Sequence, residues 1–266
     1  MTAADREPVL VVEDVVAGYG DVKVLDGISL TVDAGEIVTV LGATGSGKST
    51  LLRCIVGLLP PWEGRVLING RDVNAAGTEE REEILREVGM AFQEAALLSS
   101  MTTAENVALP IVEHWHADEE TALMLARMRL GRVGLGRAGD KMPAELSGGM
   151  RKRAGIARAI ALEPRLLLLD EPSAGLDPTT ARAIDELILG LKARADMAIV
   201  AVTHEVASIN TIADRALMLA DGAIIACGTL AEVHASAEPR VQAFFRRELV
   251  ESAETTSLVD ELEWKA

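Results

Sequence analysis

The chain has 266 residues, a formal net charge of −15, and a composition that is 49% hydrophobic but only 3% aromatic. This length suits one large domain, or one domain with an inserted lobe, and its core must be mainly aliphatic. The negative charge repels phosphate backbones and argues against a nucleic-acid-binding protein. We find no secretion signal and no apolar run near the roughly 20 residues of a membrane span. Cys54 and Cys227 match no metal or redox spacing, and we expect both to be buried thiols.

In chain order, the β-rich runs 9–16 and 24–32 predict two antiparallel strands. The stretch EIVTVLGATGSGKSTLLRCIVGLL then predicts a strand, a glycine-rich loop and a helix. A strand at 65–69, a charged helix at 79–87 and the strand VGMAFQ follow.

Between 94 and 146 helical patterns replace strands. Thr102 to Glu105 has the form of a capping box, and Asp118 can cap the amphipathic run EETALMLARMRL. The sequence therefore predicts a helical lobe inserted into an α/β core.

After Ser147 the alternation of strands and helices resumes. RLLLLDEP and MAIVAVTH predict buried strands, with a helix at 179–194 between them. Asp221-Gly222 predicts the turn of a final hairpin.

The stretch GATGSGKS satisfies the phosphate-loop pattern G-x-x-x-x-G-K-[ST] and lies between a predicted strand and a predicted helix. Backbone N–H groups of such a loop wrap phosphates, Lys48 would neutralise the β- and γ-phosphates, and Ser49 would bind Mg²⁺. An ordinary glycine-rich turn is the alternative. The expected nucleotide-binding residues here are Gly42, Ala43, Thr44, Gly45, Ser46, Gly47, Lys48, Ser49 and Thr50.

The stretch LLLLDEP places two acids at the carboxyl end of a buried strand, where ligands bind in parallel sheets. We expect Asp170 to hold Mg²⁺ through water and Glu171 to point at the water that attacks the γ-phosphate. A solvated turn is the alternative. His204 ends another core strand on the same edge, which favours contact with the γ-phosphate over a structural role.

Two further residues are assigned by position. Gln93 ends the strand VGMAFQ where the helical lobe begins, so it can touch Mg²⁺ or the attacking water. Tyr19, the only tyrosine, is predicted in a glycine-flanked loop, where its ring stacks on adenine or simply packs.

A second glycine turn, LSGGMRKR at 146–153, also precedes a helix. Arg151, Lys152 and Arg153 crowd its first turn, where the helix dipole disfavours cations by about 0.3–1 kcal/mol each. Cations are best tolerated there opposite a nucleotide or the acids of a partner, and a solvated basic patch is the alternative.

The phosphate loop, Gln93, LSGGM, LLLLDE, SAGLD at 173–177 and His204 appear in the order typical of the ATP-binding subunits of ABC transporters, which the chain resembles over 9–228. The resemblance implies a homodimer with two copies packed head to tail. Each signature turn, formed by Ser147, Gly148 and Gly149, would close on the γ-phosphate held by the other copy.

The fold class implied is α/β, a P-loop NTPase core of the ABC ATPase type with an antiparallel β subdomain and an inserted helical subdomain. We expect the core at 8–93 and 147–228, the helical subdomain at 94–146 and a C-terminal extension at 229–266. The implied cofactors are ATP and Mg²⁺.

Met150 replaces the usual glutamine of the signature. Together with the stretches 92–115 and 228–245, this variant resembles a narrower group within the family, the ATPases of Mce-type lipid transporters. The maintenance-of-lipid-asymmetry system of Gram-negative bacteria is one such transporter. This implies phospholipid cargo, an integral membrane permease, an Mce-domain lipid-binding protein and, in some such systems, a small STAS-domain protein. The chain would then be cytoplasmic and peripheral on the inner membrane through the permease. No nucleic acid is expected.

Three alternatives share parts of this pattern. An importer of another cargo, such as polar amino acids, would share every ATP-site residue. A non-transport ABC ATPase is disfavoured by the acidic charge and the single cassette. An ATP-binding regulator without turnover is disfavoured by the presence of Glu171 and His204.

Two surfaces are candidates for partner contacts. The apolar segment 95–103 would receive a permease helix, with internal packing as the alternative. In the tail, Val241, Phe244, Phe245 and Leu249 share one helical face, and Trp264 lies in a short apolar cluster. We expect the tail to cross to the second copy or to a small partner, with a solvated end as the alternative.

Overall fold

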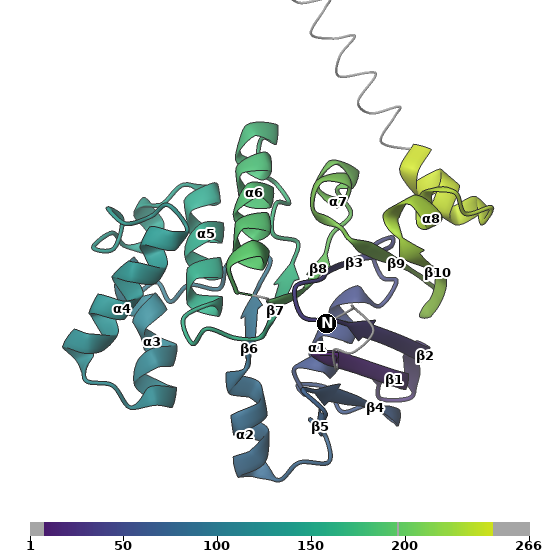
Figure 1. The fold of residues 1–266 in the computed structure, drawn as a ribbon, viewed down its shortest axis with the longest axis horizontal. Helices are drawn as coiled ribbons and strands as arrows, with labels where there is room; N and C mark the ends of the chain where they lie inside the picture. The colour runs from purple at the N-terminus through teal and green to yellow at the C-terminus, as the bar shows by residue number, and fades with distance from the viewer. Residues whose placement is uncertain (1–7, 196, 247–266) are drawn as a thin grey trace, which may run out of the picture.

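The computed structural model describes residues 8–195 and 197–246, which form two sheets with helices around them (Figure 1). The smaller sheet is antiparallel, with the order β2-β1-β4-β5. Its strands are β1 (Leu10–Tyr19), β2 (Val22–Val32), β4 (Glu63–Ile68) and β5 (Arg71–Asp72).

The larger sheet has the order β10-β9-β3-β8-β7-β6. All its neighbouring strands are parallel except β9 and β10, which form an antiparallel hairpin. Asp221 and Gly222 turn this hairpin with φ angles of 51° and 77°, as a two-residue turn of this kind requires. The strands are β3 (Ile37–Leu41), β6 (Val88–Ala91), β7 (Leu166–Asp170), β8 (Ala198–Val202), β9 (Arg215–Ala220) and β10 (Ala223–Thr229).

The four leucines of β7 explain how the larger sheet is buried. Leu167 and Leu169 pack into an aliphatic cluster with α3 to α6, whereas Leu166 and Leu168 pack into a second cluster between the two sheets. Because successive side chains of a strand point to opposite faces, a strand covered on both sides is apolar at every position. The prediction of a doubly buried strand is therefore confirmed.

The helices surround this sheet, and α3, α4 and α5 lie together at one end, beyond β6 (Figure 1). The predicted caps are confirmed, since Thr102 forms a capping box with Glu105 and Asp118 accepts from the backbone of Thr121. The helices are α1 (Lys48–Ile55), α2 (Thr78–Arg86), α3 (Thr103–Trp115), α4 (Glu119–Arg132), α5 (Gly148–Ala159), α6 (Pro178–Ala195), α7 (Val206–Ile212) and α8 (Leu230–His234), with a 3₁₀ turn at Pro143–Glu145 and a further helical stretch at 239–246.

Two expectations are wrong. Tyr19 is the last residue of β1, paired with Val22, and the loop begins only at Gly20. Cys54 is buried, which raises the pKa of its thiol to about 11, but Cys227 is exposed because it lies on the edge strand β10.

The amphipathic face predicted in the tail packs on its own chain. Val241 is fully buried against a cluster from β9 and α7, and Phe244 and Phe245 pack around it with ring centroids 5.3 Å apart. Leu249 and Trp264 lie outside the described residues. Among the residues that the structure describes, no helix is both long and apolar enough to cross a membrane.

Candidate active site

The phosphate loop connects β3 to α1, as predicted. Gly42 and Gly47 have φ angles of 147° and 106°, in the region that favours glycine. A Cβ on Gly42 would collide with the carbonyl oxygen of Leu219, and one on Gly47 would lie 2.7 Å from a methyl group of Leu25. The loop can therefore be built only with glycines at these positions, and it leads into the N-terminus of α1, where backbone N–H groups attract anions.

Lys48 is the first residue of α1 and is buried. Its Nζ donates to the carbonyl oxygens of Gly42 at 2.8 Å and Ala43 at 2.9 Å, so the ammonium lies within the loop. Burial lowers the pKa of Lys48, and the neighbouring Glu171 and Asp170 act in the opposite direction. Among the remaining loop residues, Ala43, Thr44, Gly45 and Ser49 are exposed, whereas Ser46 and Thr50 are buried.

Glu171 follows β7 directly and is bonded to the next strand of the sheet. Its backbone N–H donates to the carbonyl of Val202 on β8 at 2.8 Å. Its Oε1 lies 2.7 Å from Nδ1 of His204, which follows β8. Its Oε2 is buried and has no hydrogen-bond partner among the described residues. One carboxylate oxygen is thus held by a histidine, and the other is a buried acceptor without a partner among the described residues, which is unusual for a purely structural carboxylate.

Gln93 and His204 each lie two residues beyond a strand, after β6 and β8 respectively, and both are exposed. Since β6, β7 and β8 are parallel neighbours, these residues and Asp170 come to the same edge of the sheet. Burial and the adjacent Glu171 raise the pKa of Asp170. Lys48, whose charge lowers that pKa, brings the phosphate loop to the same edge.

Mg²⁺ fits the oxygen donors at this edge. Among the described residues, no group of three or more His, Cys, Asp or Glu side chains could hold a metal ion on its own. Ser49, Gln93 and Asp170 offer a hydroxyl, an amide oxygen and a carboxylate. These are the hard ligands of an Mg²⁺ that keeps waters and is completed by substrate phosphates.

Tyr19 lies at the end of β1, and 44% of its surface is exposed. Arg53, in the last turn of α1, donates from Nη1 to the tyrosine hydroxyl at 2.7 Å and lies 6.0 Å from the ring centroid. This distance permits a cation–π interaction. Sequence reasoning missed Arg53, because only the fold brings α1 beside β1.

Ser147 caps α5, accepting at Oγ from the N–H of Met150 at 3.3 Å, and Gly148 and Gly149 form the first turn. A Cβ on Gly149 would collide with the methyl group of Thr180. In Figure 1, α5 lies with α3 and α4, and β6 and β7 separate it from α1. The signature turn and the phosphate loop therefore begin two helices that β6 and β7 separate.

The three cations after this turn have partners in their own chain. Arg151 donates to the carbonyl of Leu146 at 2.8 Å, and Arg153 donates to that of Val133 at 3.4 Å. Lys152 donates from Nζ to the carbonyl of Glu171 at 2.7 Å.

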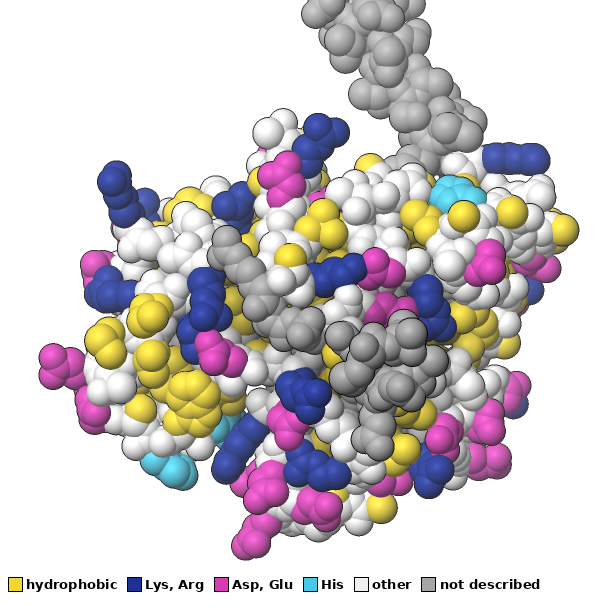
Figure 2. Space-filling model, in the orientation of Figure 1, with side chains coloured by type: hydrophobic (Ala, Val, Ile, Leu, Met, Phe, Trp, Pro, Cys, Tyr) yellow, Lys and Arg dark blue, Asp and Glu magenta, His cyan; other side chains and the backbone are white. Residues whose placement is uncertain are grey.

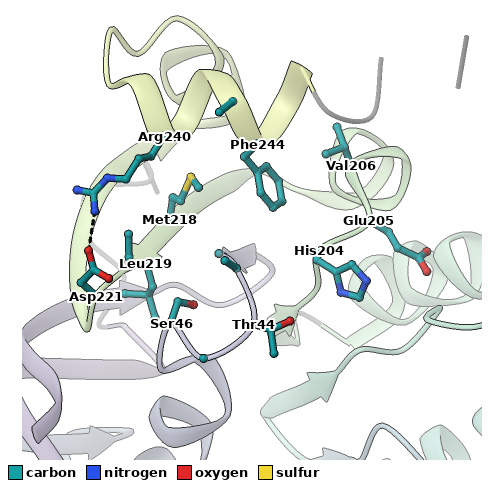
Figure 3. A pocket seen from close by; sticks show the side chains of 15 residues that line it. Thr44, Ser46, His204, Glu205, Val206, Met218, Leu219, Asp221, Arg240 and Phe244 are labelled. Carbon is teal, nitrogen blue, oxygen red and sulfur yellow. Dashed lines mark hydrogen bonds and ion pairs between the residues drawn. The ribbon is translucent and has the colours of Figure 1, made fainter. Parts of the chain in front are cut away.

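A pocket of about 730 Å³ lies beside the phosphate loop (Figure 3). Thr44, Ser46 and His204 line one side, and Phe244 and Arg240 of the C-terminal helical stretch line the other. Arg240 is bonded to Asp221 of the hairpin turn at 2.9 Å. The sequence does not predict that Arg240 and Phe244 line this pocket, because their position depends on how the end of the chain packs on β9.

A phosphate loop, an acidic pair after a buried strand, a histidine on the neighbouring strand and a separate capped glycine turn define an ATP-hydrolysing cassette. A family model described as "ABC transporter" matches residues 25–174, and the chain belongs to this family. It is 40% identical to the intermembrane phospholipid transport system ATP-binding protein MlaF of Haemophilus influenzae, over 86% of this chain and 87% of that protein. It is also 41% identical to the methionine import ATP-binding protein MetN of Rhizobium johnstonii, over 90% of this chain and 66% of that protein.

Among solved structures, the chain resembles a dimeric ATP-binding cassette in a post-hydrolysis state with ADP and Pi bound. The TM-score is 0.76 at 31% identity, and the match covers 83% of this chain and 98% of that chain.

Proposed function

We propose that two copies of this chain bind and hydrolyse MgATP to drive a membrane permease that moves phospholipid across the envelope of a Gram-negative bacterium. The observation that carries the proposal is the geometry of Glu171, whose Oε1 is held by His204 while the buried Oε2 has no partner among the described residues. Similarity to MlaF over most of both chains supports the cargo.

In this proposal the loop residues 42–50 and Lys48 hold the triphosphate, and Ser49, Asp170 and Gln93 hold Mg²⁺. The metal would neutralise developing charge on the phosphates. Glu171 orients or deprotonates the attacking water, and His204 contacts the γ-phosphate. Tyr19 stacks on adenine, which its exposure at the end of β1 permits.

The second half of each ATP site comes from the other copy, through Ser147, Gly148 and Gly149. The separation of α5 from α1 and the likeness to a dimeric cassette support this arrangement. We retain the division into a core at 8–93 and 147–228, a helical subdomain at 94–146 and an extension at 229–266.

The partners proposed are the permease, an Mce-domain lipid-binding protein and a small STAS-domain protein, with the chain on the cytoplasmic face of the inner membrane. Hydrophobic side chains gather over α3 and α4 (Figure 2), where Val112, Trp115, Met124 and Met128 are exposed. An apolar surface of this kind supports contact with another protein.

The rival cargo is an amino acid, because the chain is as similar to the methionine import protein MetN, at 41% identity, as to MlaF, at 40%. Co-purification distinguishes the two hypotheses about the cargo. If the cargo is lipid, a permease and an Mce-domain protein should co-purify with the tagged chain. Co-purification of a complex that takes up amino acids would contradict the lipid proposal.

The chemistry is tested by Glu171→Gln, which removes a base but keeps the size of the side chain. We expect unchanged MgATP binding and a hydrolysis rate reduced by about 10²–10⁴-fold, the usual worth of a positioned proton acceptor. Lys48→Ala should instead lose nucleotide binding, because the charge of the triphosphate is no longer compensated. Near-normal turnover in Glu171→Gln would reject this role.

A further inference from the structure

Of the three cations in the run 151–153, Lys152 is the one that contacts Glu171, the residue with the proposed catalytic carboxylate. It lies on α5, one turn beyond the signature serine, and its Nζ donates to the carbonyl oxygen of Glu171 at 2.7 Å. The sequence predicted that this cation would face a nucleotide or a partner. In the structure it faces the active centre of its own chain.

Four acids act electrostatically on this ammonium group, and they come from three separate segments of the chain. Glu94 lies in the turn after β6, Asp170 and Glu171 lie at the end of β7, and Glu205 directly precedes α7. Burial lowers the pKa of Lys152, and all four acids act in the opposite direction. An amine at this position balances negative charge that the fold gathers around the attacking water.

The contact from Lys152 matters because of the backbone conformation of Glu171. Its φ angle is 48°, a left-handed conformation that a glutamate rarely adopts. The N–H of this residue is held by Val202, and its side chain is held by His204, so both of these restraints come from β8 and the loop after it. Lys152 holds the carbonyl and is the restraint that comes from α5.

We propose that Lys152 is a positioning residue for ATP hydrolysis that acts within its own chain, by fixing the backbone of Glu171 so that its carboxylate faces the attacking water. The inference rests on the proposed function, which assigns Glu171 that role. Ser147 on the same helix would act on the nucleotide of the other copy. One helix therefore serves two ATP sites, the partner's through its N-terminus and its own through Lys152.

Three variants of the full-length chain test the role in hydrolysis. Lys152→Met removes the donor and the charge, and we expect kcat to fall at least about tenfold, the worth of one charge-assisted hydrogen bond. Lys152→Arg keeps both and should restore most of the rate. Arg153→Gln is the matched control, since it removes a neighbouring charge whose donor points to Val133 instead, and it should hydrolyse ATP at the wild-type rate.

A second measurement separates action within the chain from action on the partner. In a Glu171→Gln background ATP should hold two copies together, and the dimer content is measured by sedimentation. If Lys152 acts within its own chain, adding Lys152→Met leaves this ATP-dependent dimer and the ATP affinity unchanged. Weaker dimerisation with ATP would assign Lys152 to the partner's nucleotide and overturn the proposal.

The outcomes distinguish a failure of the proposed function from a failure of the inference about Lys152. Normal turnover in Glu171→Gln removes the proposed function and the inference together. Slow turnover in Glu171→Gln combined with a wild-type kcat in Lys152→Met removes the inference alone. If Lys152→Met does not fold, Lys152→Gln takes its place under the same criteria, with thermal unfolding as the check.

Discussion

Glu171 occupies a backbone conformation that costs a non-glycine residue about 1–3 kcal/mol. Such a conformation persists only when surrounding contacts determine it. Here the contacts are a backbone hydrogen bond from its N–H to Val202, a side-chain bond to His204 and the bond that its carbonyl accepts from Lys152. The carboxylate is consequently held in place by contacts within the chain itself, which is the arrangement that its proposed role in catalysis requires.

Tyr19 provides a prediction at the scale of one residue. If its ring stacks on adenine, Tyr19→Ala should weaken ATP binding by about 1–3 kcal/mol, the usual worth of one aromatic–base stack. Tyr19→Phe keeps the ring and loses only the bond from Arg53, so its loss should be smaller. Titration with ATP by calorimetry measures both, and equal affinities for wild type and Tyr19→Ala would assign Tyr19 to packing.

At this scale the sequence predicts residues whose role follows from local context. Asp170 and Glu171 end an all-leucine strand, and Lys48 belongs to a continuous motif. It does not predict Arg53 or Lys152, whose partners lie far along the chain and meet them only after α1 docks near β1 and α5 docks near β7. The crowding of cations at the start of α5 indicates a negative neighbour for Lys152, but nothing local indicates that this neighbour is Glu171 of the same chain.

At the scale of elements, the segment between β6 and α3 is fixed to α5. Ala95 and Ala96 have left-handed φ angles of 59° and 46°. Their carbonyl oxygens accept from the guanidinium of Arg158 on α5, at 2.9 and 2.8 Å. A Cβ on Gly155 would approach the Cβ of Ala95 to 3.1 Å, so the glycine permits this close approach. The segment that follows Gln93 is thereby bonded and closely packed to α5.

Leu98 in this segment provides the prediction at the element scale. Asn106 bonds both backbone groups of Leu98, at 2.7 and 3.0 Å, whereas 43% of the leucine is exposed. Leu98→Glu should therefore leave thermal unfolding within about 0.5 kcal/mol of wild type, as for surface changes generally. If a permease helix docks here, the variant should lose co-purification with the permease and lose transport.

The control for Leu98 is another exposed leucine, Leu58, which follows α1 and is 69% exposed. Leu58→Glu should transport normally. Unchanged permease binding and transport in Leu98→Glu would remove this segment as the docking site.

The elements themselves were largely predictable, because burial dictates their patterns. The doubly buried β7 and the capped starts of α3 and α4 carry strong local signals. The errors fall at ends and edges, where tertiary contacts decide. Pairing with Val22 extends β1 to Tyr19, and the position of β10 at the edge of its sheet exposes Cys227.

At the scale of the whole molecule, β6 and β7 lie between α1, which begins at the phosphate loop, and α5, which begins beside Ser147 (Figure 1). In the proposed function the phosphate loop and Glu171 belong to one half of an ATP site, and Ser147 belongs to the other. A second copy placed head to tail would join unlike halves twice. The extension beyond 246, which we predicted to cross to that copy or to a small partner, lies outside the described residues, and this expectation stays a prediction.

The shared-site arrangement predicts complementation between two defective chains. Ser147→Arg blocks the signature half, and Lys48→Ala blocks the phosphate half, so either homodimer should be inactive. A heterodimer of the two, isolated with two affinity tags, has one complete site and should hydrolyse ATP well above either parent. The matched control pairs wild type with a chain that carries both substitutions. There each site has one defective half, and hydrolysis should be as low as in the parents. Because both heterodimers contain the same two changes, only their arrangement differs, and equal ATPase rates would contradict sites shared between copies.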